Sequence, residues 1–184
     1  MKISAIEKIC KEAKEIRLFV VDGVQWLSAG YGCYPWFGMP RMTAEQLCGM
    51  FDIPEDKRGK YRLDDNVEAP TRYYSFEDYD KDERPLCQSA ISVVVDGVVL
   101  VPCKTDAGLM WIQPRLFLPF SSLKTDAGEG VTYHVRKTPS GGPYVAVKMG
   151  ISLVGLVMPY AIPEGGAQAE NIRTFASWIG GLGV

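Results

Sequence analysis

The residues most often used in catalysis and metal binding are few and widely spaced in this sequence. It holds one histidine, His134, so a centre built from several histidines cannot form within one chain. The cysteines share no CxxC or CxxH spacing, which argues against a structural zinc site. They are Cys10, Cys33, Cys48, Cys87 and Cys103. We therefore expect no metal and no cofactor, and the spacing assigns no catalytic residue.

A small enzyme that uses a thiol or carboxylates is an alternative. His134 beside a nucleophile from another segment would give Cys–His chemistry, and Cys33 or Cys103 could supply the thiol. Strand alternation places His134 on one face with Arg136, and we expect His134 to face solvent. Residues 52–84 hold 11 of the 22 acids, which could bind magnesium or act in pairs. The simpler interpretation of these acids is a solvated surface.

Aromatic side chains gather in a glycine-rich stretch, residues 30–41. Aromatic rings beside an arginine can stack on nucleic-acid bases or anchor a protein interface. The alternative is that these rings fold back over the core. We predict this stretch as the main binding surface, with contacts from Tyr31, Tyr34, Trp36, Phe37 and Arg41.

Two short repeats indicate an internal pattern. Residues 20–24 (Val-Val-Asp-Gly-Val) recur as residues 94–98, and Asp-Gly between apolar residues predicts a two-residue β-hairpin turn. The repeat fits either two related hairpin modules or coincidence. Lys-Thr-Asp-Ala-Gly occurs at residues 104–108 and again at 124–128. These are either two similar turns or a paired loop surface, in which Lys104 and Lys124 become further binding candidates.

The second Asp-Gly segment also resembles a strand of DNA sliding clamps and the Thr-Asp-Gly turn that follows it. The residues that carry the resemblance are Val95-Asp96-Gly97-Val98-Val99-Leu100-Val101, then Thr105-Asp106, then Gly108-Leu109-Met110-Trp111-Ile112. Ala107 interrupts the turn in this sequence. The resemblance implies antiparallel modules and association with DNA. Because clamps have no catalytic residues, it transfers none.

Hydrophobic periodicity predicts an α+β fold, mainly antiparallel sheet, with about three helices. The helices are expected at residues 4–15, from Thr43 to Pro54 with a capping box at Thr43 and Gln46, and at 167–179. Strands are expected at residues 16–21 and 24–27 and over most of the second half, which includes an irregular extended segment at 110–120. The chain divides into a helix-hairpin-helix module (1–51), an acidic aromatic connector (52–84) and a β-rich module with a C-terminal helix (85–184), which together could form one compact domain.

Bulk properties limit the possible functions. The net charge of −2 gives no overall basic field for binding nucleic acid. The longest apolar run, residues 149–162, is too short to span a bilayer, and no signal peptide precedes the first helix, so we expect a cytoplasmic protein without membrane contact. Our leading hypothesis is a non-enzymatic binding or assembly protein that contacts a protein partner or a second copy of itself. The alternatives are the clamp-like, DNA-associated protein and the small enzyme.

Overall fold

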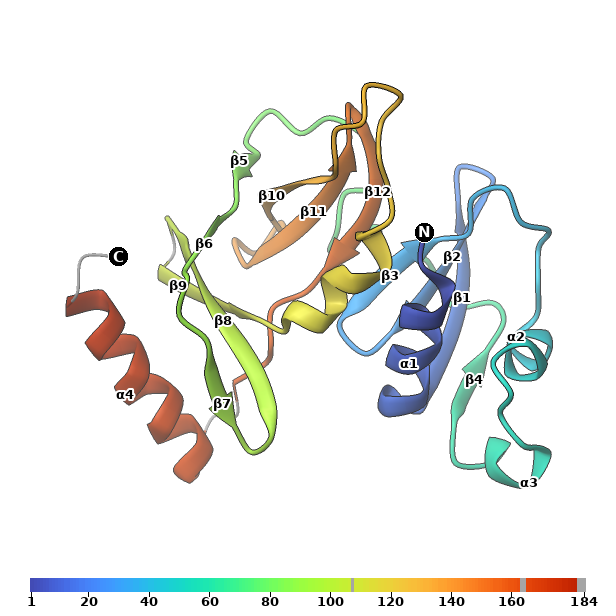
Figure 1. Ribbon diagram of the computed structural model, residues 1–184, viewed down its shortest axis with the longest axis horizontal. Helices are drawn as coiled ribbons and strands as arrows, with labels where there is room; N and C mark the ends of the chain where they lie inside the picture. The colour runs from blue at the N-terminus through green and yellow to red at the C-terminus, as the bar shows by residue number, and fades with distance from the viewer. Residues whose placement is uncertain (107, 163–164, 182–184) are drawn as a thin grey trace.

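A mixed sheet of eight strands forms the centre of the protein (Figure 1). The computed structural model describes residues 1–106, 108–162 and 165–181. Neighbouring strands are antiparallel except β1 and β4, which run parallel. In spatial order the strands are β4 (Arg62–Asp64), β1 (Glu15–Val21), β2 (Val24–Ala29), β3 (Gly32–Pro35), β12 (Ser152–Val157), β11 (Pro143–Met149), β10 (Thr132–Lys137) and β5 (Arg84–Pro85). Because β3 pairs with β12, the two ends of the sequence share one sheet.

In a second, smaller antiparallel sheet, β8 pairs with each of the other three strands. Its strands are β6 (Cys87–Gln88), β7 (Val93–Val95), β8 (Val98–Thr105) and β9 (Gly108–Ile112). Helix α4 (Ala167–Gly181) packs against this sheet, where Ile172 is buried beside Val93 and Trp111. The small sheet and α4 lie at the opposite end of the molecule from α2 and α3 (Figure 1).

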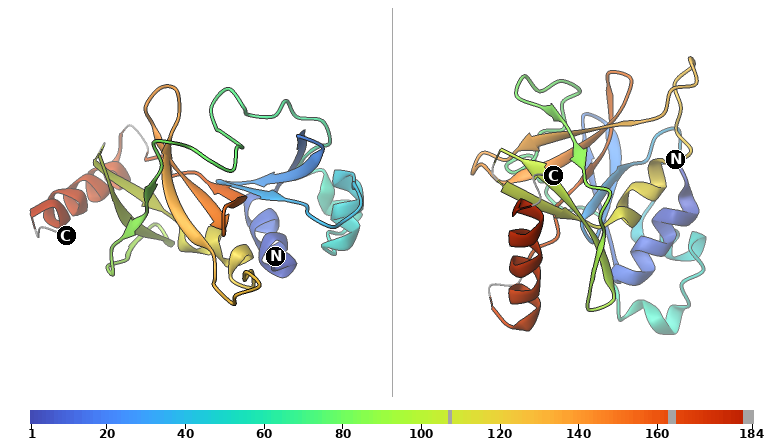
Figure 2. Two further views of the ribbon diagram at one scale, coloured as in Figure 1. Left: turned by 90° about the horizontal axis from the view of Figure 1, so that it is seen from above. Right: turned by 60° about the vertical axis from the view of Figure 1, so that its left-hand side comes forward.

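The remaining helices lie on the first face of the large sheet, as the left view of Figure 2 shows. They are α1 (Ile3–Ala13), α2 (Ala44–Met50), α3 (Glu55–Arg58) and the 3₁₀ helix η1 (Pro114–Phe120). Helix α1 buries Ile6, Ile9 and Cys10 at helical spacing. The capping box of α2 is present: the hydroxyl of Thr43 accepts a hydrogen bond from the backbone N–H of Gln46, and the side-chain oxygen of Gln46 accepts one from the backbone N–H of Thr43.

The α+β class and the mainly antiparallel sheet are confirmed, but the number of helices was predicted too low. The described residues form five helices, and the sequence did not indicate α3 or η1. The segment expected to be extended to residue 120 leaves β9 and becomes η1. Proline fixes φ near the helical value, so Pro114 suits a first turn. Phe120 then packs on Gly155 of β12, where a Cβ atom would overlap its ring.

Both Asp-Gly pairs form the predicted hairpin turns. Asp22 and Asp96 each have φ of 48°, and Gly23 and Gly97 have φ of 81° and 78°, the left-handed pair that a two-residue turn needs. Each hairpin continues into a third antiparallel strand, β3 in one case and β9 in the other. Two related modules would share this strand order. Any two unrelated three-stranded meanders would share it as well, so the order does not decide between the two interpretations of the repeat. In the first Lys-Thr-Asp-Ala-Gly segment, residues 104–108, Ala107 lies outside the described residues.

Residues 65–83, which we call the strap, cover the second face of the large sheet (Figure 2). The backbone of Val67 bonds to Leu18, and the N–H of Ser75 donates to the Tyr144 hydroxyl at 2.9 Å. Apolar strap residues pack over the rings of Phe19 and Trp26. The acidic segment is therefore a covering layer of the sheet as well as a connection between strands.

One carboxylate fastens the end of the strap. Glu83 accepts hydrogen bonds from the guanidinium of Arg136 at 2.7 and 2.9 Å and from the ammonium of Lys148 at 2.6 Å. Arg136 is 1% exposed and also donates to the backbone carbonyls of Glu77 and Asp78. His134 lies on the same face and is half-buried, so it faces solvent only in part. The sequence could not show that the strap covers this strand.

We predict that Glu83→Gln destabilises the fold by roughly 3–5 kcal/mol, because it leaves two buried cations without a negative partner. Urea unfolding followed by tryptophan fluorescence measures this loss. The control is Glu68→Gln, which removes an exposed ion pair with Arg72 and should cost at most about 0.5 kcal/mol. Equal losses in the two variants would show that the Glu83 cluster does not hold the strap.

Stability should also depend on acid through the same carboxylate. Burial alone would raise the pKa of Glu83, but the hydrogen bonds from Lys148 and Arg136 outweigh burial and hold its pKa below the ordinary value of 4.5. A lowered pKa in the folded state stabilises the fold above the unfolded pKa and loses this contribution as the pH falls through the folded value. The difference in unfolding free energy between wild type and Glu83→Gln should thus shrink below about pH 4.5. Burial lowers the pKa of His134 and the charge of Glu83 opposes this effect, so the comparison is made with His134→Gln in both proteins. A difference that stays constant into strong acid would contradict the assignment.

Candidate functional site

The structure divides the predicted aromatic surface between the core and the exterior. Residues 32–35 form β3 rather than a loop. Tyr34 is fully buried, its hydroxyl donates to the carbonyl of Leu116 at 3.4 Å, and its ring packs on Phe120. Trp36 is 6% exposed. The alternative interpretation, in which the rings fold back over the core, thus describes Tyr34 and Trp36.

The other three candidates of this stretch are more exposed. Tyr31 is half-buried with its ring 6.0 Å from that of Tyr160. Phe37 is 53% exposed. Arg41 is exposed, and its guanidinium donates to the carbonyl of Gly23 at 3.3 Å, which fixes the arginine against the β1–β2 turn. Only Phe37 therefore presents a largely free ring.

The two lysine candidates belong to separate parts of the fold. Lys104 lies on β8 opposite Cys87 of β6 and lines a cavity of about 510 Å³ with Arg84 and Lys137. Lys124 is exposed in the loop between η1 and β10. The repeated pentapeptide thus occurs at the end of one strand and inside one long loop.

A cavity of about 550 Å³ connects Trp36 and Phe37 to distant parts of the sequence. We call it the Trp36 pocket. Its walls come from the start of α1, the stretch after β3, the loop after η1 and the β11–β12 turn. The lining residues are Met1, Ile3, Ile6, Pro35, Trp36, Phe37, Met39, Leu123, Met149, Ser152 and Val154.

The chemistry of this pocket is almost wholly apolar. Buried Ile6 and Trp36 form its inner part, whereas Phe37 and Met39 are exposed at its edge. Ile151, in the turn between Met149 and Ser152, is 83% exposed and does not line the cavity. No lining side chain is ionisable, and Ser152 supplies the one hydroxyl. The pocket can therefore bind apolar groups.

The thiols named for the enzyme alternative are poor nucleophiles. Cys33 and Cys103 are buried, and burial raises the pKa of Cys33 to about 12 and that of Cys103 to about 11. Such thiols stay protonated near neutral pH, and the thiolate is the reactive form. Within the described residues, no three or more His, Cys, Asp and Glu side chains are grouped so as to hold a metal ion. Nor does this part of the chain contain a helix long and apolar enough to cross a membrane.

No protein-family model, curated protein or solved structure matches this chain. The geometry of its own residues therefore carries the functional argument. Composition had indicated Trp36 and Phe37. No local pattern indicated that Met1, Leu123 and Met149 lie beside them, because these residues are far apart along the chain and meet only in the folded protein.

We predict that an aromatic disulfide reagent at neutral pH modifies one thiol per native chain, Cys87, since this is the exposed cysteine. The other four cysteines are buried and should react only after unfolding in denaturant. Absorbance of the released thiolate counts the groups, and Cys87→Ser should abolish the fast reaction. Rapid modification of Cys33 or Cys103 in the folded protein would revive the thiol-enzyme alternative.

Proposed function

We propose that this protein is a non-enzymatic binding protein that takes apolar side chains of a protein partner into the Trp36 pocket. The observation that carries the proposal is the exposure of Phe37 and Met39 at the edge of a cavity lined by buried Trp36 and Ile6. Large apolar side chains that stay in water around a cavity are typical of interaction sites. A cytoplasmic location belongs to the proposal, because an exposed free thiol at Cys87 suits a reducing compartment.

The energetics favour an apolar anchor from the partner. Each Leu, Ile, Phe or Met side chain that moves from water into such a pocket contributes about 1.5–3 kcal/mol. Methionine is unbranched and polarisable, so the side chains of Met1, Met39 and Met149 can adapt to anchors of different shape. Trp36, held by the surrounding core, supplies a rigid surface below them.

The extent of the surface favours a polypeptide over a small apolar molecule. A small molecule would fill the cavity but leave much of Phe37 and Met39 in water. A peptide segment that inserts one side chain can also cover these two residues at the edge, and so removes more apolar surface from water. A second copy of this chain could supply the segment, which light scattering of the free protein tests.

The clamp-like, DNA-associated role is the second hypothesis. The observation in its favour is the repeated three-stranded meander with matching Asp-Gly turns. Among the described residues, at least ten of the Lys and Arg side chains lie within 4.0 Å of a carboxylate, which leaves fewer of them available to contact phosphates. If the role is real, duplex DNA should bind in a salt-dependent manner, and Lys104→Ala with Lys124→Ala should weaken it.

We predict that peptides panned from a random phage library on the wild-type protein carry apolar anchors and bind the Trp36 pocket. In protein labelled with ¹³C at the methionine methyl groups, such a peptide should shift the signals of Met1, Met39 and Met149. The signals of Met110 and Met158, which lie outside the pocket, serve as internal controls. The double variant Phe37→Ser, Met39→Ser should lower affinity at least tenfold, because it removes two apolar contacts.

A matched surface change separates this effect from a general loss of apolar surface. Val94→Ser alters an exposed valine on the small sheet, and it should leave peptide affinity within a factor of two of wild type. Melting temperatures of both variants should stay near that of wild type. Peptides that bind the double variant as tightly as wild type, or that shift only Met110 and Met158, would refute the proposed site.

A further inference from the structure

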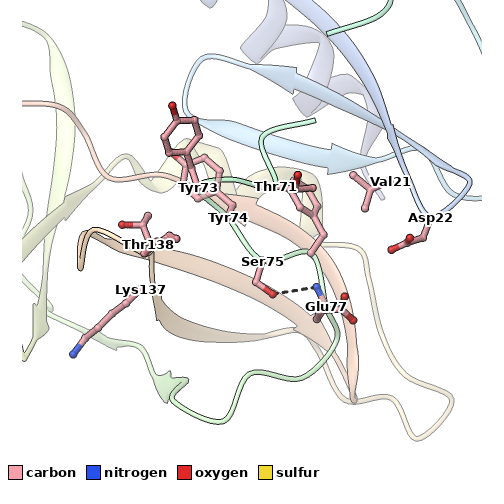
Figure 3. A pocket seen from close by; sticks show the side chains of 11 residues that line it. Val21, Asp22, Thr71, Tyr73, Tyr74, Ser75, Glu77, Lys137 and Thr138 are labelled. Carbon is pink, nitrogen blue, oxygen red and sulfur yellow. Dashed lines mark hydrogen bonds between the residues drawn. The ribbon is translucent and has the colours of Figure 1, made fainter. Parts of the chain in front are cut away.

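A second cavity, of about 530 Å³, lies where the strap meets the β1–β2 turn and the end of β10 (Figure 3). Tyrosines and carboxylates dominate its chemistry. We call it the tyrosine pocket and define it by Tyr73, Tyr74, Asp22 and Glu77. It shares no lining residue with the Trp36 pocket.

Two tyrosine rings form adjacent walls of this pocket. The ring centres of Tyr73 and Tyr74 are 6.4 Å apart and their planes are inclined by 55°. The backbone N–H groups of both residues donate to the carbonyl of Pro70 at 3.0 Å, which makes a tight turn and sends two consecutive rings to the same cavity. Both rings therefore line one cavity side by side.

The core fixes one wall and leaves the other open. Tyr74 packs edge-to-face on Tyr144 at 5.1 Å, and the Tyr144 hydroxyl accepts the N–H of Ser75, so this part of the strap is held in place. Tyr73 is 61% exposed. Phe76, the third aromatic residue of the lining, is held edge-to-face against Trp26 at 4.9 Å. The pocket is therefore preformed on one side and accessible on the other.

The charges around the pocket are mainly negative. Asp22 and Glu77 line it, and neither carboxylate forms an ion pair or hydrogen bond with the described residues. The one cation of the lining, Lys137, pairs with Asp106 at 3.4 Å, and Figure 3 shows its ammonium pointing away from the tyrosines. The strap itself carries seven acids and two bases over residues 65–83. This field attracts cations and repels anions.

We propose that the tyrosine pocket binds an organic cation, namely an alkylammonium group. The negative face of an aromatic ring attracts a cation, and two inclined rings can contact one methylated or unmethylated ammonium group together. The unpaired carboxylates attract a cation electrostatically, and a neutral ligand does not gain this attraction. The cation could belong to a small molecule or to a lysine side chain of a polypeptide, and both have this chemistry in common.

Titrations with three ligands test the chemistry in the full-length protein. The probes are choline, its uncharged isostere 3,3-dimethylbutanol, and an acetylated, amidated Gly-Lys-Gly peptide. Choline should shift the amide NMR signals of residues 71–77 and of Lys137 and Thr138, and it should saturate in the millimolar range. The isostere has the same shape without the charge, so it should bind at least tenfold more weakly.

Variants distinguish the rings from the carboxylates. Tyr73→Ala should reduce choline affinity at least fivefold, whereas Tyr73→Phe keeps the ring face and should stay within a factor of two of wild type. Glu77→Gln should reduce affinity two- to fivefold. Tyr79→Ala, a change at another exposed tyrosine of the strap, is the matched control and should have no effect.

Each outcome decides the proposal. Saturation by choline alone assigns a small ammonium ligand, and tighter binding of the lysine peptide assigns a polypeptide cation. The proposal is overturned if choline and its isostere bind equally, if neither cation saturates, or if Tyr73→Ala binds choline like wild type while its melting temperature is unchanged.

Discussion

The cluster in which the carboxylate of Glu83 binds both Arg136 and Lys148 is the interaction that holds the strap on the second face of the large sheet. A strap with almost no regular backbone hydrogen bonding has to be held by side chains. This cluster provides five charge-assisted hydrogen bonds at its end, three to the carboxylate and two from Arg136 to the carbonyls of Glu77 and Asp78. Each of the two cations would be costly to bury alone, so the three charges are stable only together. Because the strap stays in place, the aromatic face of the large sheet is shielded from water and Tyr74 keeps a fixed position.

The two faces of the large sheet are therefore covered in physically different ways. Helices α1, α2 and η1 cover the first face by apolar packing, and their own backbone bonds are satisfied internally. The strap covers the second face with a few rings and a set of polar contacts. The Trp36 pocket and the tyrosine pocket each lie where one of these layers ends, and the lining of each pocket has the composition of that layer. The Trp36 pocket is apolar like the helical layer, and the tyrosine pocket is aromatic and acidic like the strap.

Local structure was predictable because local patterns determine it. The Asp-Gly turns and the capping box at Thr43 involve residues at most a few positions apart. The burial of Arg136 beneath the strap was not predictable, since its hydrogen bond to Glu83 joins residues more than fifty positions apart. For the site, residue type indicated the aromatic stretch, but exposure followed from strand geometry. Alternation along β3 puts Tyr34 and Trp36 on the same core face, a signal that the sequence contained once residues 32–35 are taken as a strand.

The composition of the Trp36 pocket also limits what the proposed binding can achieve by itself. An apolar surface rewards burial of almost any apolar side chain, so it gives affinity but little discrimination between partners. Direction and register of a bound segment have to come from polar groups at the edge of the cavity. Ser152 is the one hydroxyl of the lining, and it lies beside the exposed turn that carries Ile151. A segment that inserts an apolar anchor and places a hydrogen-bonding group over this turn would satisfy both requirements, and this pairing is the specificity that the site is able to encode.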